Sequence, residues 1–301
     1  MADTLGLGPS PARGASSSLA LPTMDFKYFS MNGELLPIKQ AVVPLSNVEY
    51  QYGFGVYENI RVNNGIPYFL KDHLVRLEES ARIIGLEHNF DERFVEKSID
   101  ELIGKNGAGT YNLKILLIGG KEPSLNILCL NPLFPDKKLY TEGAAFITYE
   151  YERPLPHAKT LNMLQSYLAY KKAREVGAYD ALLINAKGCI TEGTRTNFFS
   201  LQDRTLVSPP ESEILLGVTR SAVLKVAKEA GFSLEERDMS FSEATKSDGA
   251  FVTSTSSKIV PVRSIDGQAF GAIPEALKEL MRAFDAFLSS CSGKLRRSGE
   301  Y

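Results

Sequence analysis

The chain has 301 residues, of which 44% are hydrophobic and 23% charged, a composition typical of a globular protein with room for two hydrophobic cores. The formal net charge is −2 and the 34 Lys and Arg residues are scattered, so nothing provides the basic surface that nucleic acid requires. No apolar run approaches the roughly 18 residues of a membrane span. The 3 cysteines lie far apart, which argues against a disulfide framework or a metal site and favours a cytoplasmic location.

Two terminal segments lack folding signals. Residues 1–23 are rich in Ser, Ala, Gly and Pro, and they show neither a basic start nor the continuous apolar stretch of a secretory signal. We expect a disordered leader there. Residues 291–301 are expected to form an unstructured tail.

The first half of the chain predicts a small α/β domain, residues 24–141. It opens with two hairpins, one turning at Asn32-Gly33 and the other at Asn63-Asn64-Gly65. A helix is predicted next, because apolar residues recur at spacings of three and four at Leu74, Leu77, Ala81 and Ile84. A second helix and the apolar runs LKILLIG and LNILCL, which predict strands, complete this half.

The second half predicts a larger, β-rich domain, residues 142–290. The expected elements are the strand AAFITYE, a helix from about Leu161 to Gly177, several short strands, and a helix that ends at Gly231. The segment AFVTSTSSKIVPV is predicted to be one strand, and a last helix is predicted from Pro274 to about Ser289. We expect the functional site in the cleft between the two domains, where small-molecule sites usually occur.

Lys159, in the segment HAKTLNML, precedes a predicted helix. A lysine at this position is most often an exposed surface residue. Because the N-terminus of a helix dipole disfavours cations, the pKa of this amine could also be lowered, as a Schiff-base lysine requires.

Glu192 and Gly193 lie in the segment ITEGTRTNFF. One interpretation is a tight turn in which Gly193 supplies a positive φ. The other is a carboxylate that faces a protonated ring nitrogen of a cofactor.

Two further segments have the character of anion sites. In LLGVTRSAV, the amides of Val218 and Thr219 open a predicted helix, although Thr219 could simply be its N-cap. In VTSTSSKIVPV, a cluster of hydroxyl groups follows an apolar strand, which could be a turn or a cup for phosphate or carboxylate.

The order and spacing of these segments resemble the class IV aminotransferases, a family of pyridoxal-phosphate enzymes that includes branched-chain and D-amino-acid aminotransferases and aminodeoxychorismate lyases. The resemblance covers residues 26–290. It also rests on QYGFGVYENIRVNNGIPYFLKDHLVRLEESA, similar to the family's aromatic strand and His–Leu–x–Arg–Leu helix. It implies the two-domain α/β fold of fold type IV.

The resemblance implies that Lys159 holds pyridoxal 5′-phosphate as a Schiff base and is the catalytic residue, and that Glu192 pairs with the pyridine nitrogen. The other residues that it implies for cofactor binding are Arg76, Asn197, Val218, Thr219, Ser254 and Thr255. For Arg76, the alternative is an apolar stem lying along the buried helix face with the guanidinium in water.

The resemblance also implies a substrate pocket. Tyr52, Tyr57 and Arg61 are expected on alternating positions of the strand that walls it, and Thr255 and Ser256 in a turn that binds a substrate carboxylate. The expected reaction moves an amino group between an amino acid, branched-chain or otherwise hydrophobic, and a 2-oxo acid such as 2-oxoglutarate. The alternatives are a D-amino-acid aminotransferase and an aminodeoxychorismate lyase. A homodimer or a higher homo-oligomer is expected, because in the family one subunit helps to close the site of another.

Overall fold

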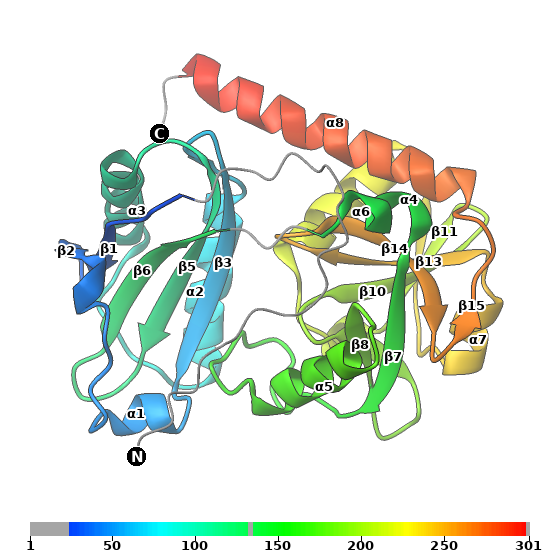
Figure 1. Cartoon of the computed structure of the whole chain (residues 1–301), viewed down its shortest axis with the longest axis horizontal. Helices are drawn as coiled ribbons and strands as arrows, with labels where there is room; N and C mark the ends of the chain where they lie inside the picture. The colour runs from blue at the N-terminus through cyan, green and yellow to red at the C-terminus, as the bar shows by residue number, and fades with distance from the viewer. Residues whose placement is uncertain (1–23, 132–134, 299–301) are drawn as a thin grey trace.

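Two β-sheets covered by helices make up the computed structural model, which describes residues 24–131 and 135–298 (Figure 1). This mixed α/β architecture confirms the expected fold class. The predicted leader, residues 1–23, lies outside the described residues. No helix in the described part of the chain is long and apolar enough to cross a membrane.

The first sheet has six strands in the order β2-β1-β6-β5-β3-β4. The strands are β1 (Tyr28–Met31), β2 (Glu34–Pro37), β3 (Gly55–Asn63), β4 (Ile66–Pro67), β5 (Thr110–Ile118) and β6 (Ser124–Leu130). Both predicted hairpins are confirmed, since β1 pairs with β2 and β3 with β4. Asn and Gly provide the positive φ angles that such tight turns require, at Asn32 and Gly33 in the first turn and at Asn64 and Gly65 in the second.

Two helices pack against this sheet. They are α2 (Leu70–Ile83) and α3 (Glu92–Asn106), and a short α1 (Val48–Gln51) precedes β3. Leu74, Leu77 and Ala81 of α2 share one core with Val56 and Ile60 of β3, as the helical periodicity predicted.

The second sheet has nine strands, and six of them form a closed ring. They are β7 (Ala144–Glu150), β8 (Asp180–Ile184), β9 (Ile190–Gly193), β10 (Asn197–Gln202), β11 (Thr205–Ser208), β12 (Ser233–Glu236), β13 (Gly249–Ser254), β14 (Lys258–Ile265) and β15 (Gln268–Ala269). The ring runs β10-β13-β14-β7-β8-β9 and closes where β9 pairs with β10, at Glu192 and Asn197. Two candidate site residues therefore lie at the closure.

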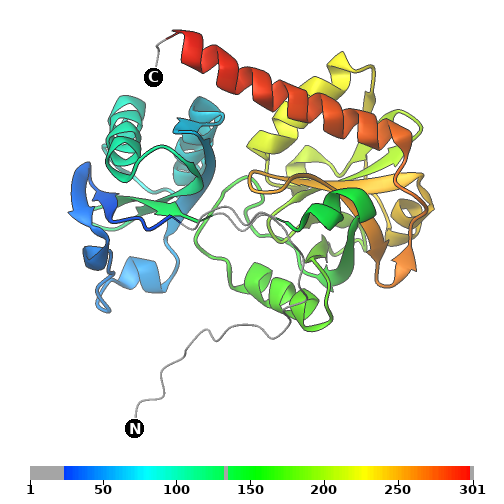
Figure 2. The ribbon, with the colours of Figure 1, turned by 45° about the horizontal axis from the view of Figure 1, so that its top comes forward.

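The remaining helices are α4 (Lys137–Glu142), α5 (Leu164–Glu175), α6 (Val218–Glu229), α7 (Phe241–Lys246) and α8 (Glu275–Ser298). In Figure 2, α8 extends from the half that contains the second sheet toward the half that contains the first. We propose that the two sheets are the cores of two domains, residues 24–141 and 142–290.

Two element predictions were wrong. The last helix continues to Ser298, beyond the predicted end near Ser289, because each residue added to an existing helix gains a hydrogen bond even where Ser and Gly are poor helix formers. The segment AFVTSTSSKIVPV is two antiparallel strands, β13 and β14, rather than one. The turn between them forms because Ser254 Oγ accepts a hydrogen bond from the Ser257 amide at 3.1 Å.

Candidate active site

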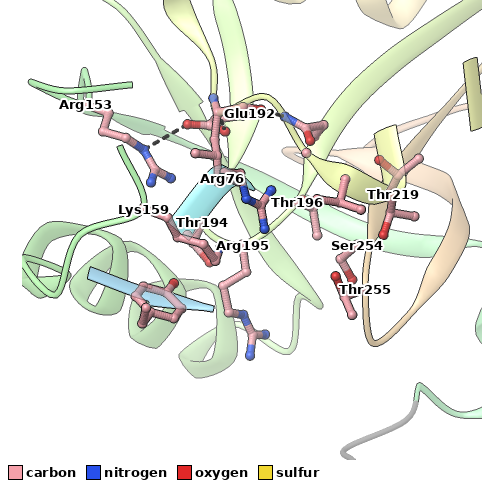
Figure 3. Close-up of a pocket in the computed structure, with 16 residues that line it drawn as sticks. Arg76, Arg153, Lys159, Glu192, Thr194, Arg195, Thr196, Thr219, Ser254 and Thr255 are labelled. Carbon is pink, nitrogen blue, oxygen red and sulfur yellow. Dashed lines mark hydrogen bonds and ion pairs between the residues drawn. The ribbon is translucent and has the colours of Figure 1, made fainter. Parts of the chain in front are cut away.

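A pocket lies between the two halves of the molecule (Figure 3). Its lining comes from β3 and α2 on one side and from β9, β10, α6 and β13 on the other, together with the segment before α5. The lining residues are Tyr57, Arg76, Arg153, Lys159, Glu192, Thr194, Arg195, Thr196, Asn197, Leu215, Gly217, Val218, Thr219, Thr253, Ser254 and Thr255. All eight residues predicted to bind a cofactor are among them.

Lys159 is held in place through its backbone. Its amide donates to Ser80 Oγ of α2 at 3.0 Å, and its carbonyl accepts from the amide of Tyr57 at 2.9 Å. The next residue, Thr160, forms a bridge with Val56 of β3. The lysine segment therefore lies along β3, and the Lys159 amine stands 4.6 Å from the centre of the Tyr57 ring.

The pKa of the Lys159 amine is lowered, as predicted, but the physical cause differs from the predicted one. Because α5 begins at Leu164, Lys159 is not at a helix N-terminus, and the helix-dipole argument does not apply. Burial of the amine, reinforced by the positive charge of Arg76, lowers the pKa of Lys159 to about 7. A large share of the amine is therefore uncharged near neutral pH.

Glu192 lies at one end of the pocket and is paired with Arg153, a residue that the sequence interpretation missed. Arg153 Nε is 2.9 Å from Glu192 Oε1, while Glu192 Oε2 accepts from the Leu215 amide at 3.2 Å. The N–H of Arg153 does not point at Oε1 with hydrogen-bond geometry, so the contact is an ion pair only. Among the described residues, Oε1 is therefore a buried acceptor that receives no hydrogen bond. Burial raises the pKa of Glu192, and the charge of Arg153 opposes that rise.

At the other end of the pocket, Arg76 and the start of α6 provide donors that could hold an anion. The N-cap of α6 is Gly217, whose lack of a side chain leaves the first amides, those of Val218 and Thr219, without a side-chain cap. Nearby, the hydroxyls of Thr196 and Thr253 are buried and have no hydrogen-bond partner among the described residues. Buried polar groups normally have partners, so these atoms indicate a ligand that is rich in acceptors.

Arg76 is oriented by Glu58, which the sequence interpretation also missed. Arg76 donates to both Glu58 oxygens, at 2.6 and 2.8 Å, and to the Leu216 carbonyl at 3.1 Å. Burial alone would raise the pKa of Glu58, but Arg76 and His73 hold it far below the usual range. Glu58 shares its period-two position with the core residues Val56 and Ile60, a pattern that could have revealed a buried carboxylate.

His73 completes this cluster. Its Nδ1 is 2.7 Å from Glu58 Oε2, and both side chains are buried. Because the ionised Glu58 carboxylate can only accept, His73 Nδ1 carries a hydrogen and donates it, and burial lowers the pKa of His73. Arg76 thus grips a fixed carboxylate rather than extending into water, which the alternative interpretation required.

Two sequence interpretations of local geometry were wrong. Thr219 is not an N-cap, since Gly217 holds that position. Gly193 does not have a positive φ; a Cβ added there would lie 2.1 Å from Thr196 Oγ1, so close packing, not backbone conformation, requires glycine.

The residues predicted for substrate binding are placed less uniformly. Tyr57 and Thr255 line the pocket. Tyr52 is not on β3 as predicted, because the chain turns at Gly53; it caps α1 and is 80% exposed. Arg61 lies on β3 and donates to the Ser256 carbonyl at 3.4 Å. Arg61 and Ser256 therefore lie next to the pocket residue Thr255 but do not line the pocket themselves.

Residues 55–265 match the sequence model of the family described as "Amino-transferase class IV". The chain belongs to the class IV aminotransferases. It is 34% identical to a D-alanine aminotransferase of Bacillus licheniformis over 253 residues, which cover 80% of this chain and 89% of that protein.

Solved structures of class IV aminotransferases agree with this fold. The branched-chain amino acid aminotransferase of Escherichia coli has a TM-score of 0.81 and 26% identity, and the match covers 87% of this chain and 94% of that one. The T.th. branched-chain enzyme, solved with pyridoxamine 5′-phosphate, also has a TM-score of 0.81 and 26% identity, covering 90% of this chain and 95% of that one. The cofactor of this class IV aminotransferase is pyridoxal 5′-phosphate.

Proposed function

We propose that this aminotransferase moves an amino group from an amino acid with a branched-chain or other hydrophobic side chain to 2-oxoglutarate, and that Lys159 is its catalytic residue. The observation that carries the proposal is the arrangement of three groups in one pocket: an amine with a pKa of about 7, a buried carboxylate oxygen without a donor, and an anion site.

The residues present fit pyridoxal 5′-phosphate. Glu192 Oε1, which receives no hydrogen bond from the described residues, suits a protonated ring nitrogen, and Arg76, Thr255 and the amides of Val218 and Thr219 suit the phosphate. We place Ser254 in the same phosphate wall. Asn197 supports the phosphate site indirectly. Its side-chain amide donates to the Leu215 carbonyl at 2.7 Å and so holds the loop that carries Gly217.

Bound pyridoxal phosphate supplies an electron sink for the charge that develops at the substrate Cα. Lys159 would hold it covalently, and its amine would carry the proton between the substrate Cα and the cofactor. The lowered pKa of Lys159 keeps this amine able to accept a proton near neutral pH. Glu192 would keep the cofactor's ring nitrogen protonated.

The substrate side is walled by Tyr57, whose ring is buried beside the Lys159 amine. We propose that the turn at Thr255 and Ser256, together with Arg61, binds a substrate carboxylate. The likeness to two branched-chain aminotransferases supports a hydrophobic amino donor.

A D-amino-acid donor is the second candidate. The Tyr57 hydroxyl contacts Met163 Sδ at 3.7 Å, and the relative from Bacillus licheniformis is a D-alanine aminotransferase. Elimination of pyruvate from an aminodeoxychorismate-like substrate is the third candidate, since a lyase would use the same cofactor site.

A spectrophotometric half-reaction screen separates the three candidates. The holoenzyme is mixed with single L- and D-amino acids, and conversion of the cofactor to pyridoxamine phosphate is followed. We expect L-leucine, L-isoleucine and L-valine to react faster than D-alanine. Faster reaction of D-amino acids would select the second candidate, and release of pyruvate without pyridoxamine phosphate the third.

Lys159→Ala is the matched variant for the catalytic assignment. It should show no half-reaction with any amino acid, while its circular dichroism stays that of the wild type. Borohydride reduction of the wild-type holoenzyme, followed by peptide mapping, should place the label on Lys159. A label on another lysine would overturn the assignment.

A further inference from the structure

Two residues beside the pocket have a backbone conformation that their side chains disfavour. Phe69 has a φ of 55° and Lys258 a φ of 59°, in the left-handed region that bulky residues rarely adopt. The other non-glycine residues with positive φ in the described part of the chain are Asn32, Asn64, Asp203 and Asp266, whose types tolerate this conformation in turns. Phe69 and Lys258 are therefore strained, and such residues persist only where neighbouring contacts hold them.

Phe69 adjoins the helix that carries Arg76. It is the N-cap of α2, and its carbonyl accepts a hydrogen bond from the amide of His73 at 3.1 Å, which starts the helix. Arg76 follows about two helical turns after Phe69 and lines the pocket. The conformation of Phe69 thus sets the direction in which α2 leaves the preceding chain.

Lys258 adjoins the turn between β13 and β14. It is the first residue of β14 and pairs with Ser254, so that Thr255, Ser256 and Ser257 form the loop between them. Glycine is the usual residue at the left-handed position of such short hairpin loops. A lysine at this position makes the shape of the loop depend on what holds the side chain.

One helix, α8, contacts both strained residues. The Phe287 ring stacks on the Phe69 ring, with centroids 6.2 Å apart and an interplanar angle of 14°. Two residues earlier on α8, the Asp285 carboxylate binds the Lys258 amine at 2.5 Å. Both contacts are possible because α8 extends from the half that contains the second sheet toward the half that contains the first (Figure 1).

The contact at Phe69 belongs to a hydrophobic core that the two halves share. Tyr68, from the first half, is buried in one cluster with Leu280, Phe284 and Leu288 of α8, and Phe69 packs against this cluster. Burial of these side chains offsets the strain at Phe69.

At Lys258 the compensation is electrostatic. The side chain of Asp285 is 60% exposed, so its pair with Lys258 is weak, which matches the modest cost of one left-handed residue. The conformation of the turn is therefore sensitive to this single pair.

We propose that Phe287 and Asp285 are positioning residues of the active site. Phe287 fixes the start of α2, and with it Arg76, while Asp285 fixes the turn after Thr255. Neither residue lines the pocket, so each acts through the strained residue that it contacts. The inference rests on the proposed function, in which Arg76 binds the cofactor phosphate and the turn binds a substrate carboxylate.

Binding of 4-methylvalerate and 4-methylvaleramide to the holoenzyme tests the role of Asp285. The two ligands have nearly the same shape, and only the first is a carboxylate. In isothermal titration, Asp285→Asn should weaken binding of 4-methylvalerate about five- to tenfold, because the turn leaves its strained form, and should barely change binding of the amide. A direct charge effect would have the opposite sign, since loss of an acidic group favours an anion. Glu275→Gln is the control, because Glu275 pairs with Arg282 within α8.

Substitution of Lys258 separates positioning from a general loss of stability. Glycine adopts a positive φ without strain, so in a Lys258→Gly background Asp285→Asn should no longer affect binding of 4-methylvalerate. Lys258→Val, which resists the left-handed conformation, should weaken this binding as Asp285→Asn does. An equal effect of Asp285→Asn with Lys258 and with glycine at this position would overturn the role of Asp285.

Phe287 is tested on the cofactor side. Phe287→Ala should weaken retention of pyridoxal phosphate in equilibrium dialysis about three- to tenfold, the range for loss of an aromatic pair, and leave the ratio of the two ligand affinities unchanged. If this variant does not fold, as judged by circular dichroism, Phe287→Leu takes its place. Wild-type cofactor retention in the folded variant would overturn the role of Phe287.

Hydrogen exchange distinguishes failure of this inference from failure of the proposed function. Amides of residues 254–260 should exchange faster in Asp285→Asn than in the wild type, whether or not the turn binds a carboxylate. If the proposed function fails, the wild-type enzyme converts no amino acid and the exchange difference remains. Unchanged exchange in Asp285→Asn would show that α8 does not hold the turn.

Discussion

The lowered pKa of Lys159 results mainly from the burial of its amine. With a pKa of about 7, the uncharged fraction of the amine grows as the pH rises through 7. Only the uncharged amine attacks an aldehyde, so the rate of covalent capture of pyridoxal phosphate by the apoenzyme should rise about tenfold per unit below that pH and level off above about 8. Stopped-flow absorbance measures this rate. A rate that keeps rising to pH 10 would show that the pKa is ordinary.

Glu58 contacts the proposed phosphate site through Arg76, whose guanidinium it orients. Glu58→Gln removes the charge that fixes this guanidinium but keeps the size of the side chain, so it should weaken retention of pyridoxal phosphate about tenfold or more. Because the pair is buried, we also expect a loss of about 3–5 kcal/mol in the free energy of unfolding. Equilibrium dialysis and denaturant titration measure the two effects.

The control for Glu58→Gln is the same substitution at Glu79 on α2. Glu79 pairs with Arg82 on the surface, so its loss should leave both quantities nearly unchanged. Equal cofactor retention in the two variants would remove Glu58 from the phosphate site.

At the scale of elements, the junction of β10 with the start of α6 depends on Gly217. A Cβ at this position would lie 2.1 Å from Asn197 Oδ1, so Gly217→Ala must displace either Asn197 or the first turn of α6. We predict a loss of cofactor affinity of roughly tenfold, because the amides of Val218 and Thr219 move away from the phosphate. Fluorescence titration of the apoenzyme with pyridoxal phosphate measures it.

Gly104→Ala is the matched control for Gly217→Ala. Gly104 lies within α3, and a Cβ there meets no atom within 4 Å. This variant should gain about 0.5–1 kcal/mol of stability and bind the cofactor as the wild type does. Wild-type cofactor affinity in Gly217→Ala as well would refute the role of this junction.

At the scale of the whole molecule, we propose at least a homodimer. Large apolar side chains are exposed on α5 and on the segment before β3, where Tyr52 is 80%, Leu164 63% and Tyr167 60% exposed. Tyr52 lines one cavity together with Asn162 and Ser166, so the two segments are neighbours. Exposed apolar patches of this kind are characteristic of interfaces.

The prediction is that Leu164→Glu combined with Tyr167→Glu shifts the protein from dimer to monomer in sedimentation velocity. Val75→Glu is the control, because Val75 of α2 is 64% exposed and lines a different cavity from Tyr52. A wild-type enzyme that sediments as an active monomer would contradict the proposal.

The sequence by itself determined the local features of this protein and the family to which it belongs. Asn-Gly pairs specify the two hairpin turns, apolar spacing specifies α2, and the ordered segments around Lys159, Glu192 and Thr219 suffice for the resemblance. These signals are readable because turn conformation and helical amphipathicity depend on residues close in sequence.

Only the tertiary structure decided which charges meet. Glu58 and Arg76 are 18 residues apart, and Arg153, in the segment between β7 and α5, meets Glu192 of β9. Pairing, burial and pKa depend on packing between distant segments, which no local pattern encodes.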